Sequence, residues 1–134
     1  VSGMSASDRV VAYTFPDGVL TGFDVMVGSA PTLYASLCVG AIAGIVAAAC
    51  VVPDLVVQLY ELTRAGRHAE AVVLQRKITP LAKSVTSTFG VAGLKAAMEL
   101  AGYVGGAPRR PLPPATPQIY ETLRSQFAAL GLRV

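Results

Sequence analysis

Residues 23–54 read FDVMVGSAPTLYASLCVGAIAGIVAAACVVPD, with no Asp, Glu, Lys or Arg between Asp24 and Asp54. Because turn-forming glycines and prolines divide this uncharged run, we read it first as a strand–helix–strand unit buried on both faces. The run predicts a strand over residues 23–27, a helix over 31–40 and a second strand over 44–52. A short strand covered on both sides by helices is typical of a parallel sheet.

The residues between these segments fit the same arrangement. Ser29 is suited to cap the first helix, and Pro31 fits its first turn. Gly40 is suited to end that helix in a left-handed conformation. Pro53 and Asp54 then begin the next helix, where a negative charge complements the positive end of the helix dipole. The order strand, helix, strand, helix predicts an α/β fold with a right-handed crossover.

A membrane span is the alternative interpretation of the same run. Its length is sufficient to cross a bilayer, and Gly40 and Gly44 have the spacing of closely packed transmembrane helices. The interrupting glycines and prolines and the Asp on both flanks argue against it. We therefore expect no membrane contact. The net charge of +3 is scattered along the chain, so we also expect no nucleic-acid surface.

The composition indicates that this chain packs against more protein. Among its 134 residues 53% are hydrophobic and only 14% charged, which is low for an independent domain of this size. The chain starts at Val1 with no signal-like segment, so we expect it to continue something larger. Cys38 and Cys50 lie in apolar runs, and we expect buried free thiols in a reducing compartment. His68 lies in a polar turn and is expected to be a solvated surface residue.

The chain after the uncharged run is predicted to be helical. An apolar stripe predicts a helix over 53–65 that Gly66 ends, and a second helix follows, which Pro80 should kink. A short helix over 92–100 precedes a Gly- and Pro-rich connector at 105–117. Thr116 is suited to cap the last helix, which should end near residue 130. We therefore divide the chain into an α/β part, residues 1–66, and a helical part, residues 67–134.

The order of several short motifs resembles one family over residues 23–130. They are Val-Gly-Ser-Ala at 27–30, Ala-Ser at 35–36, Gly-Ala at 40–41, Ala-Gly at 43–44 and Ala-Cys-Val at 49–51. In the tail they are residues 89–95, residues 102–106, Arg109, Pro111 and Leu112. Together they are similar to strands seven and eight and the C-terminal helices of the dihydrodipicolinate synthase / N-acetylneuraminate lyase family. Those proteins are class I aldolase-type (β/α)8 TIM barrels.

The resemblance implies a fold and an activity. It implies the C-terminal part of a (β/α)8 TIM barrel followed by an all-helical C-terminal extension. It also implies a Schiff-base-forming lyase that acts on 2-oxo acids such as pyruvate or 4-hydroxy-2-oxoglutarate, with no cofactor or metal. The Gly-Ser-Ala at 28–30 is more like 4-hydroxy-2-oxoglutarate aldolase than dihydrodipicolinate synthase. Cys50 departs from the pattern, because many members have Asn there.

The catalytic residues implied by the resemblance lie upstream of Val1. The family uses a strand-six lysine and a proton-relay tyrosine, and the lysines of this chain, Lys77, Lys83 and Lys95, fall on tail helices. We therefore assign no catalytic residue here and expect the N-terminal part of the barrel as a partner. The resemblance further implies a homo-oligomer, a homotetramer, in the cytoplasm or mitochondrion.

Four residues are predicted to bind substrate. Gly28, Ser29 and Ala30 follow a strand, at the end where barrel active sites lie. Their alternative role is structural, a glycine for a tight turn and a serine for a helix cap. Ile45 matches a family position whose backbone carbonyl lies near the lysine nitrogen; its alternative role is that of an ordinary core residue. Arg109 and Arg110 are expected to hold the tail against the barrel.

Three functions remain open at this point. The first is the C-terminal portion of a Schiff-base lyase. The second is a non-catalytic barrel fragment that acts as a structural or interaction piece. The third is a membrane protein that uses the Gly40–Gly44 spacing.

Overall fold

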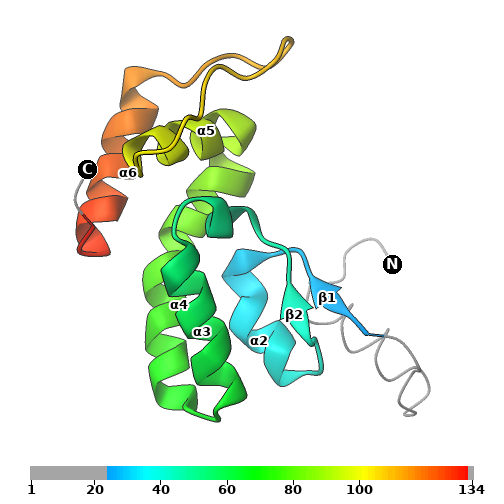
Figure 1. Cartoon of the computed structure of the whole chain (residues 1–134). Helices are drawn as coiled ribbons and strands as arrows, with labels where there is room; N and C mark the ends of the chain where they lie inside the picture. Colours follow the sequence, from blue (N-terminus) through cyan, green and yellow to red (C-terminus); the bar gives the residue numbers. More distant parts are fainter. Residues whose placement is uncertain (1–23, 133–134) are drawn as a thin grey trace.

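A computed structural model describes residues 24–132, and it begins with a parallel strand–helix–strand unit (Figure 1). Strand β1 (Met26–Val27) pairs with β2 (Ala43–Gly44) in parallel, in the register Met26 opposite Ala43 and Val27 opposite Gly44. The crossover consists of a 3₁₀ turn, η2 (Ala30–Thr32), and helix α2 (Leu33–Cys38). The predicted unit is thus confirmed, although Phe23, the predicted first strand residue, lies outside the described residues.

The second strand is shorter than the sequence predicts. Residues 47–50 form a 3₁₀ helix, η3 (Ala47–Cys50), instead of continuing the strand to residue 52. The amide of Ala49 donates to the carbonyl of Val46 at 3.0 Å, which closes a turn directly after the strand. Three consecutive alanines favour a helical turn over an extended conformation, because they lack the branched side chains that stabilise strands. This part of the prediction was wrong.

Two long helices follow and pack side by side (Figure 1). They are α3 (Pro53–Arg64) and α4 (His68–Lys83). The turn between them depends on Gly66, whose φ of 72° lies in the left-handed region that glycine adopts without strain. The amide of Arg67 returns to the carbonyl of Leu62 at 2.9 Å and completes the helix end. The predicted end of the helix over residues 53–65, at Gly66, is confirmed.

The described residues after α3 are helical as predicted, apart from the connector between α5 and α6. Pro80 is exposed and lies within α4, and after Lys83 the α-helix gives way to a π-helix, η4 (Ser84–Thr88). Helices α5 (Gly90–Leu100) and α6 (Pro117–Ala129) complete the fold. Thr116 occupies the N-cap position of α6, but its side chain makes no capping hydrogen bond.

A connector joins α5 to α6, and α5 holds its first part. The ammonium of Lys95 donates to the carbonyl of Gly105 at 2.6 Å, and the carboxylate of Glu99 accepts the amide of Gly106 at 3.0 Å. A side chain at position 105 would place Cβ only 2.1 Å from the carbonyl oxygen of Lys95. Arg109 and Arg110 are exposed in this chain, and their expected role in holding the tail against the barrel stays a prediction. Within the described residues, Lys95 and Glu99 anchor the connector to α5.

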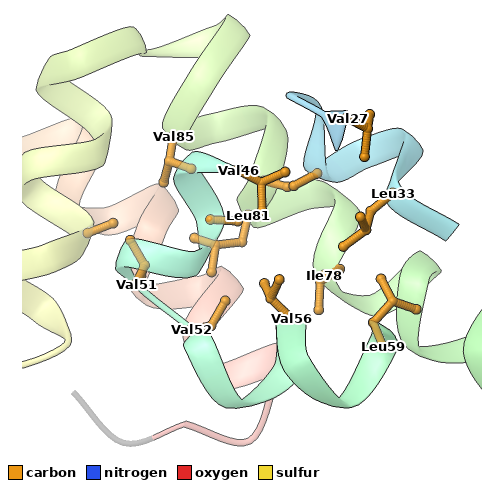
Figure 2. Packing of buried hydrophobic residues seen from close by; sticks show 14 of the residues in the cluster. Val27, Leu33, Val46, Val51, Val52, Val56, Leu59, Ile78, Leu81 and Val85 are labelled. Carbon is orange, nitrogen blue, oxygen red and sulfur yellow. The ribbon is translucent and has the colours of Figure 1, made fainter. Parts of the chain in front are cut away.

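One hydrophobic cluster extends from the strands to the last helix (Figure 2). Val46 from the strand region lies beside Leu81 and Val85 of the α4–η4 segment, and Leu33 of α2 faces Ile78. Leu123 and Phe127 of α6 are also fully buried. The helices after Gly66 therefore pack directly on the strand–helix unit. The division at residues 66 and 67 stays a prediction.

The two cysteines are exposed, contrary to the prediction of buried thiols. Cys38 ends α2 one position after the buried Leu37, and successive helical residues point about 100° apart, so it turns away from the core. Cys50 likewise ends η3. His68 is exposed as predicted, and its Nδ1 lies 3.3 Å from the hydroxyl of Tyr34.

The Gly40–Gly44 pair has a different role from that in a transmembrane helix. Gly40 has a φ of 111° in the turn after α2. A Cβ at Gly44 would lie 2.9 Å from Cδ1 of Leu33, so the missing side chain lets α2 approach the strand closely. Within residues 24–132, none of the helices combines the length and the apolar character that crossing a bilayer requires.

Candidate substrate-binding edge of the strand pair

The carboxyl ends of the two parallel strands bring the four predicted site residues together. Gly28, Ser29 and Ala30 follow β1 directly, and Ile45 follows β2 directly. The register pairs Val27 with Gly44, which makes Gly28 and Ile45 neighbours at the same edge. The amide of Ile45 donates to the carbonyl of Val27 at 2.9 Å and extends the pairing to this point. We refer to residues 28–30 and Ile45 as the strand edge.

Gly28 occupies an open position. It is exposed, its φ lies outside the left-handed region, and an added Cβ would meet none of the described atoms within 4 Å. In the described part of the chain, neither turn geometry nor close packing therefore requires glycine here. The described structure therefore does not support the alternative that Gly28 is required for a tight turn.

Ser29 lies at the N-cap position but does not cap the helix. Its backbone is extended, with φ −125° and ψ 108°, and its side chain makes no capping hydrogen bond. Its carbonyl instead accepts two hydrogen bonds from Thr32, from the amide at 3.2 Å and from the hydroxyl at 3.3 Å. The prediction that the Ser29 hydroxyl caps the helix was wrong, because Thr32 closes this turn through the backbone carbonyl.

Ile45 is not a core residue in this structure. Its side chain is 74% exposed, and Met26 on the neighbouring strand is 49% exposed. The reason is the alternation of a strand, in which successive side chains point to opposite faces. Val27 and Gly44 face α2, so Met26 and Ile45 point to the other face. The strand pair therefore has one face packed on helices and one bare apolar face.

Gln75 of α4 contacts the turn at the strand edge, a contact that the sequence pattern did not predict. Its side-chain Nε2 donates to the carbonyl of Ala30 at 3.1 Å, and its Oε1 accepts the amide of Tyr34 at 2.9 Å. The available signal was a polar residue within the apolar pattern of this helix, with Thr79 one turn later. That spacing predicts a hydrogen bond along the helix but not its partner 45 residues away.

The strand edge contains no ionisable side chain. Its chemistry is limited to peptide groups, the Ser29 hydroxyl and apolar surface. Lys77 and Lys83 are exposed on α4, and Lys95 donates to the connector, so no lysine of the described residues lies at the edge. Among residues 24–132, no group of three or more His, Cys, Asp or Glu is placed to hold a metal. The edge can thus bind and orient a small ligand through peptide groups and a hydroxyl, but it supplies no amine or other ionisable group.

A groove in the described part of the chain lies away from this edge. It has a volume of about 550 Å³ and lies between α3, α4 and the end of α6. Its lining is mainly apolar, with Gln58, Glu70 and Lys77 among the lining residues, and includes no residue of the strand edge. We therefore do not assign substrate binding to it.

Comparisons with known proteins identify relatives along almost the whole chain. The model of the dihydrodipicolinate synthetase family matches residues 5–130. The 4-hydroxy-tetrahydrodipicolinate synthase of Methanopyrus kandleri is 30% identical over 128 residues. That alignment covers 96% of this chain and 43% of the relative.

Solved structures agree with this result. The 4-hydroxy-tetrahydrodipicolinate synthase of Methylacidiphilum fumariolicum SolV superimposes with a TM-score of 0.81 at 25% identity, over 98% of this chain and 43% of that one. KD(P)GA of T. tenax superimposes with a TM-score of 0.70 at 27% identity, over 80% of this chain and 38% of that one. The chain spans less than half the length of these relatives.

Proposed function

Because this chain belongs to the dihydrodipicolinate synthetase family, we propose that it forms strands seven and eight and the helical extension of a Schiff-base-forming lyase. The substrate class is a 2-oxo acid, such as pyruvate or 4-hydroxy-2-oxoglutarate. The observation that carries the proposal is the meeting of residues 28–30 and Ile45 at the carboxyl ends of two parallel strands. In TIM barrels that edge holds the active site.

Each residue of the strand edge has a distinct role in this proposal. The peptide groups of Gly28 and Ala30 and the hydroxyl of Ser29 bind the substrate, and the open space at Gly28 leaves room for it. The carbonyl of Ile45 lies beside the reacting lysine nitrogen, and its side chain lines the barrel interior. The lysine and the proton-relay tyrosine come from outside residues 1–134, in the N-terminal part of the barrel. The complete protein is a cytoplasmic homo-oligomer.

The two substrates are favoured by different observations. The name of the Methanopyrus relative favours the synthase reaction, which that name describes. The Gly-Ser-Ala at 28–30 favours the aldolase reaction on 4-hydroxy-2-oxoglutarate. Both reactions need the same amine, so the same trapping experiment tests the class.

The first test is borohydride trapping of pyruvate, read by intact-mass and peptide mass spectrometry. The 134-residue chain should form no adduct, because none of its described lysines lies at the strand edge. The complete protein should form one adduct per chain, on a lysine outside residues 1–134. An adduct on Lys77, Lys83 or Lys95 would contradict the assignment of the active site, and no adduct on the complete protein would contradict Schiff-base chemistry.

A second test addresses Ser29. Replacing Ser29 with Leu in the complete protein should lower kcat/KM for the 2-oxo acid about tenfold or more, because a bulky side chain displaces the substrate. Stability should change by less than about 1 kcal/mol, since the Ser29 hydroxyl does not cap the helix. Ser125→Leu on the exposed side of α6 is the control. An unchanged rate in Ser29→Leu would remove Ser29 from the site.

A further inference from the structure

Gln75 connects the helical tail to the turn at the strand edge. It lies in the middle of α4, and its side chain bridges two peptide groups of the η2–α2 segment, the carbonyl of Ala30 and the amide of Tyr34. Ala30 is 1% exposed, and the amide of Tyr34 belongs to the first turn of α2. Without Gln75, the carbonyl of Ala30 and the amide of Tyr34 would each lose a hydrogen-bond partner while shielded from water. An unpaired buried polar group lowers the stability of the fold.

The orientation of the Gln75 amide follows from its partners. A carbonyl accepts and an amide donates. A flipped side chain would therefore place Oε1 of Gln75 against the carbonyl of Ala30 and Nε2 against the amide of Tyr34, and neither pair could form a hydrogen bond. The second Nε2 hydrogen donates to the hydroxyl of Thr79 at 3.1 Å, and that hydroxyl donates to the backbone carbonyl of Gln75 at 2.6 Å. Thr79 therefore fixes the rotamer of Gln75, and every polar atom of the Gln75 amide has a partner.

We propose that Gln75 is a positioning residue that holds the turn at residues 28–30 in the conformation that binds the 2-oxo acid. This inference rests on the function proposed above. Ala30 is the last residue of that turn, so its carbonyl is the point at which α4 controls the peptide planes of Gly28 and Ser29. The helical extension thereby contributes to substrate binding without contacting the substrate.

The test uses the complete protein and the variants Gln75→Leu, Gln75→Glu and Thr79→Val. Gln75→Leu removes both hydrogen bonds to the turn and should raise KM for pyruvate about tenfold, with kcat changed less than about threefold. We expect KM to change more than kcat because the turn binds the substrate and the transition state equally well. Gln75→Glu keeps an acceptor for Tyr34 but opposes the Ala30 carbonyl. The rise in KM of Gln75→Glu should become smaller at lower pH, where the protonated carboxyl can donate a hydrogen bond to the carbonyl of Ala30. Thr79→Val should show the smallest rise in KM.

Gln58→Ala is the matched control, since Gln58 is exposed at the middle of α3 and lines a groove that includes no residue of the strand edge. It should change KM less than about twofold. A second readout needs no catalysis: the amide of Tyr34 should exchange its hydrogen about tenfold faster in Gln75→Leu than in wild type.

The outcomes separate this inference from the proposed function. Active wild type with an unchanged KM in Gln75→Leu overturns the positioning role and leaves the Schiff-base proposal intact. An equal rise in KM in Gln58→Ala overturns it as well. If wild type forms no pyruvate adduct, the proposed function fails, and so does the role of Gln75 in substrate binding. Exchange at Tyr34 then decides whether Gln75 orders the turn at all.

Discussion

The strand pair and helix α6 differ in how completely their apolar side chains are covered by the rest of the chain. Leu123 and Phe127 of α6 are 0% and 1% exposed, buried against α4 and α5. The strand pair buries Val27 on one face, whereas Met26 and Ile45 on the other face are about half and three-quarters exposed. Helix α6 is therefore packed against residues of this chain, whereas Val104 in the connector before it is 94% exposed. The strand pair has the form of one stretch of a barrel wall, with helices outside and an apolar face inside.

The largest expected effect comes from removing a buried side chain of α6. Replacing Phe127 with Ala should destabilise the chain by about 3–5 kcal/mol, because it leaves a cavity among fully packed neighbours. Ile45→Ala should change the free energy of unfolding of the 134-residue chain by no more than about 0.5 kcal/mol, since that side chain is already in water. Urea unfolding at low protein concentration measures both. Equal losses would mean that the bare face is covered in solution.

A pair of glycines tests the two faces of the strands directly. Gly44→Val should cost about 1–3 kcal/mol, because its Cβ would lie 2.9 Å from Cδ1 of Leu33 on the packed face. Gly28→Ala should leave stability unchanged or raise it by up to about 1 kcal/mol, because its Cβ meets open space. Thermal unfolding of both variants beside wild type decides the point. A destabilising Gly28→Ala would show that the turn needs glycine for its backbone.

The smallest effect concerns the tail. The hydroxyl of Tyr120 donates to Glu99 at 2.5 Å, and this hydrogen bond is the main cause that raises the pKa of Tyr120 above its ordinary value. The bond stabilises the protonated folded state, fully so below the ordinary tyrosine pKa of about 10. That contribution is lost as pH rises through the raised pKa. Tyr120→Phe should lower stability by about 0.5–1 kcal/mol near pH 8, with a smaller difference near pH 11. Urea unfolding at both values measures it, and a difference that grows with pH would contradict the assignment.

The parts of the fold that follow from local sequence rules were predictable. Gly40, Gly66 and Gly131 all have positive φ at helix ends, where the sequence places them. The apolar stripe of α3 gave its bounds to within a residue. The end of β2 was missed because the apolar run 44–52 is compatible with both a strand and a tight helical turn, and periodicity does not distinguish them.

The site was predictable only where it follows the strands. The turn at residues 28–30 and Ile45 are marked by their positions directly after apolar runs and by the family resemblance. The contact of Gln75 with the turn was not predictable. Its partners are backbone groups of another segment, and backbone groups carry no sequence signal. The predicted burial of the two cysteines was wrong for a related reason. Apolar neighbours in the sequence do not determine in which direction the last residue of a short helix points.

The anchored connector between α5 and α6 has a consequence for how this chain can change over evolution. Lys95 and Glu99 hold residues 105 and 106, so only the stretch beyond them forms a free arc before Pro117. Lengthening such an arc is cheap, since doubling a flexible loop costs only about 0.6 kcal/mol. Insertions among relatives are therefore expected between residues 107 and 114. Position 105 admits no side chain while the Lys95 carbonyl lies 2.1 Å from the place of its Cβ.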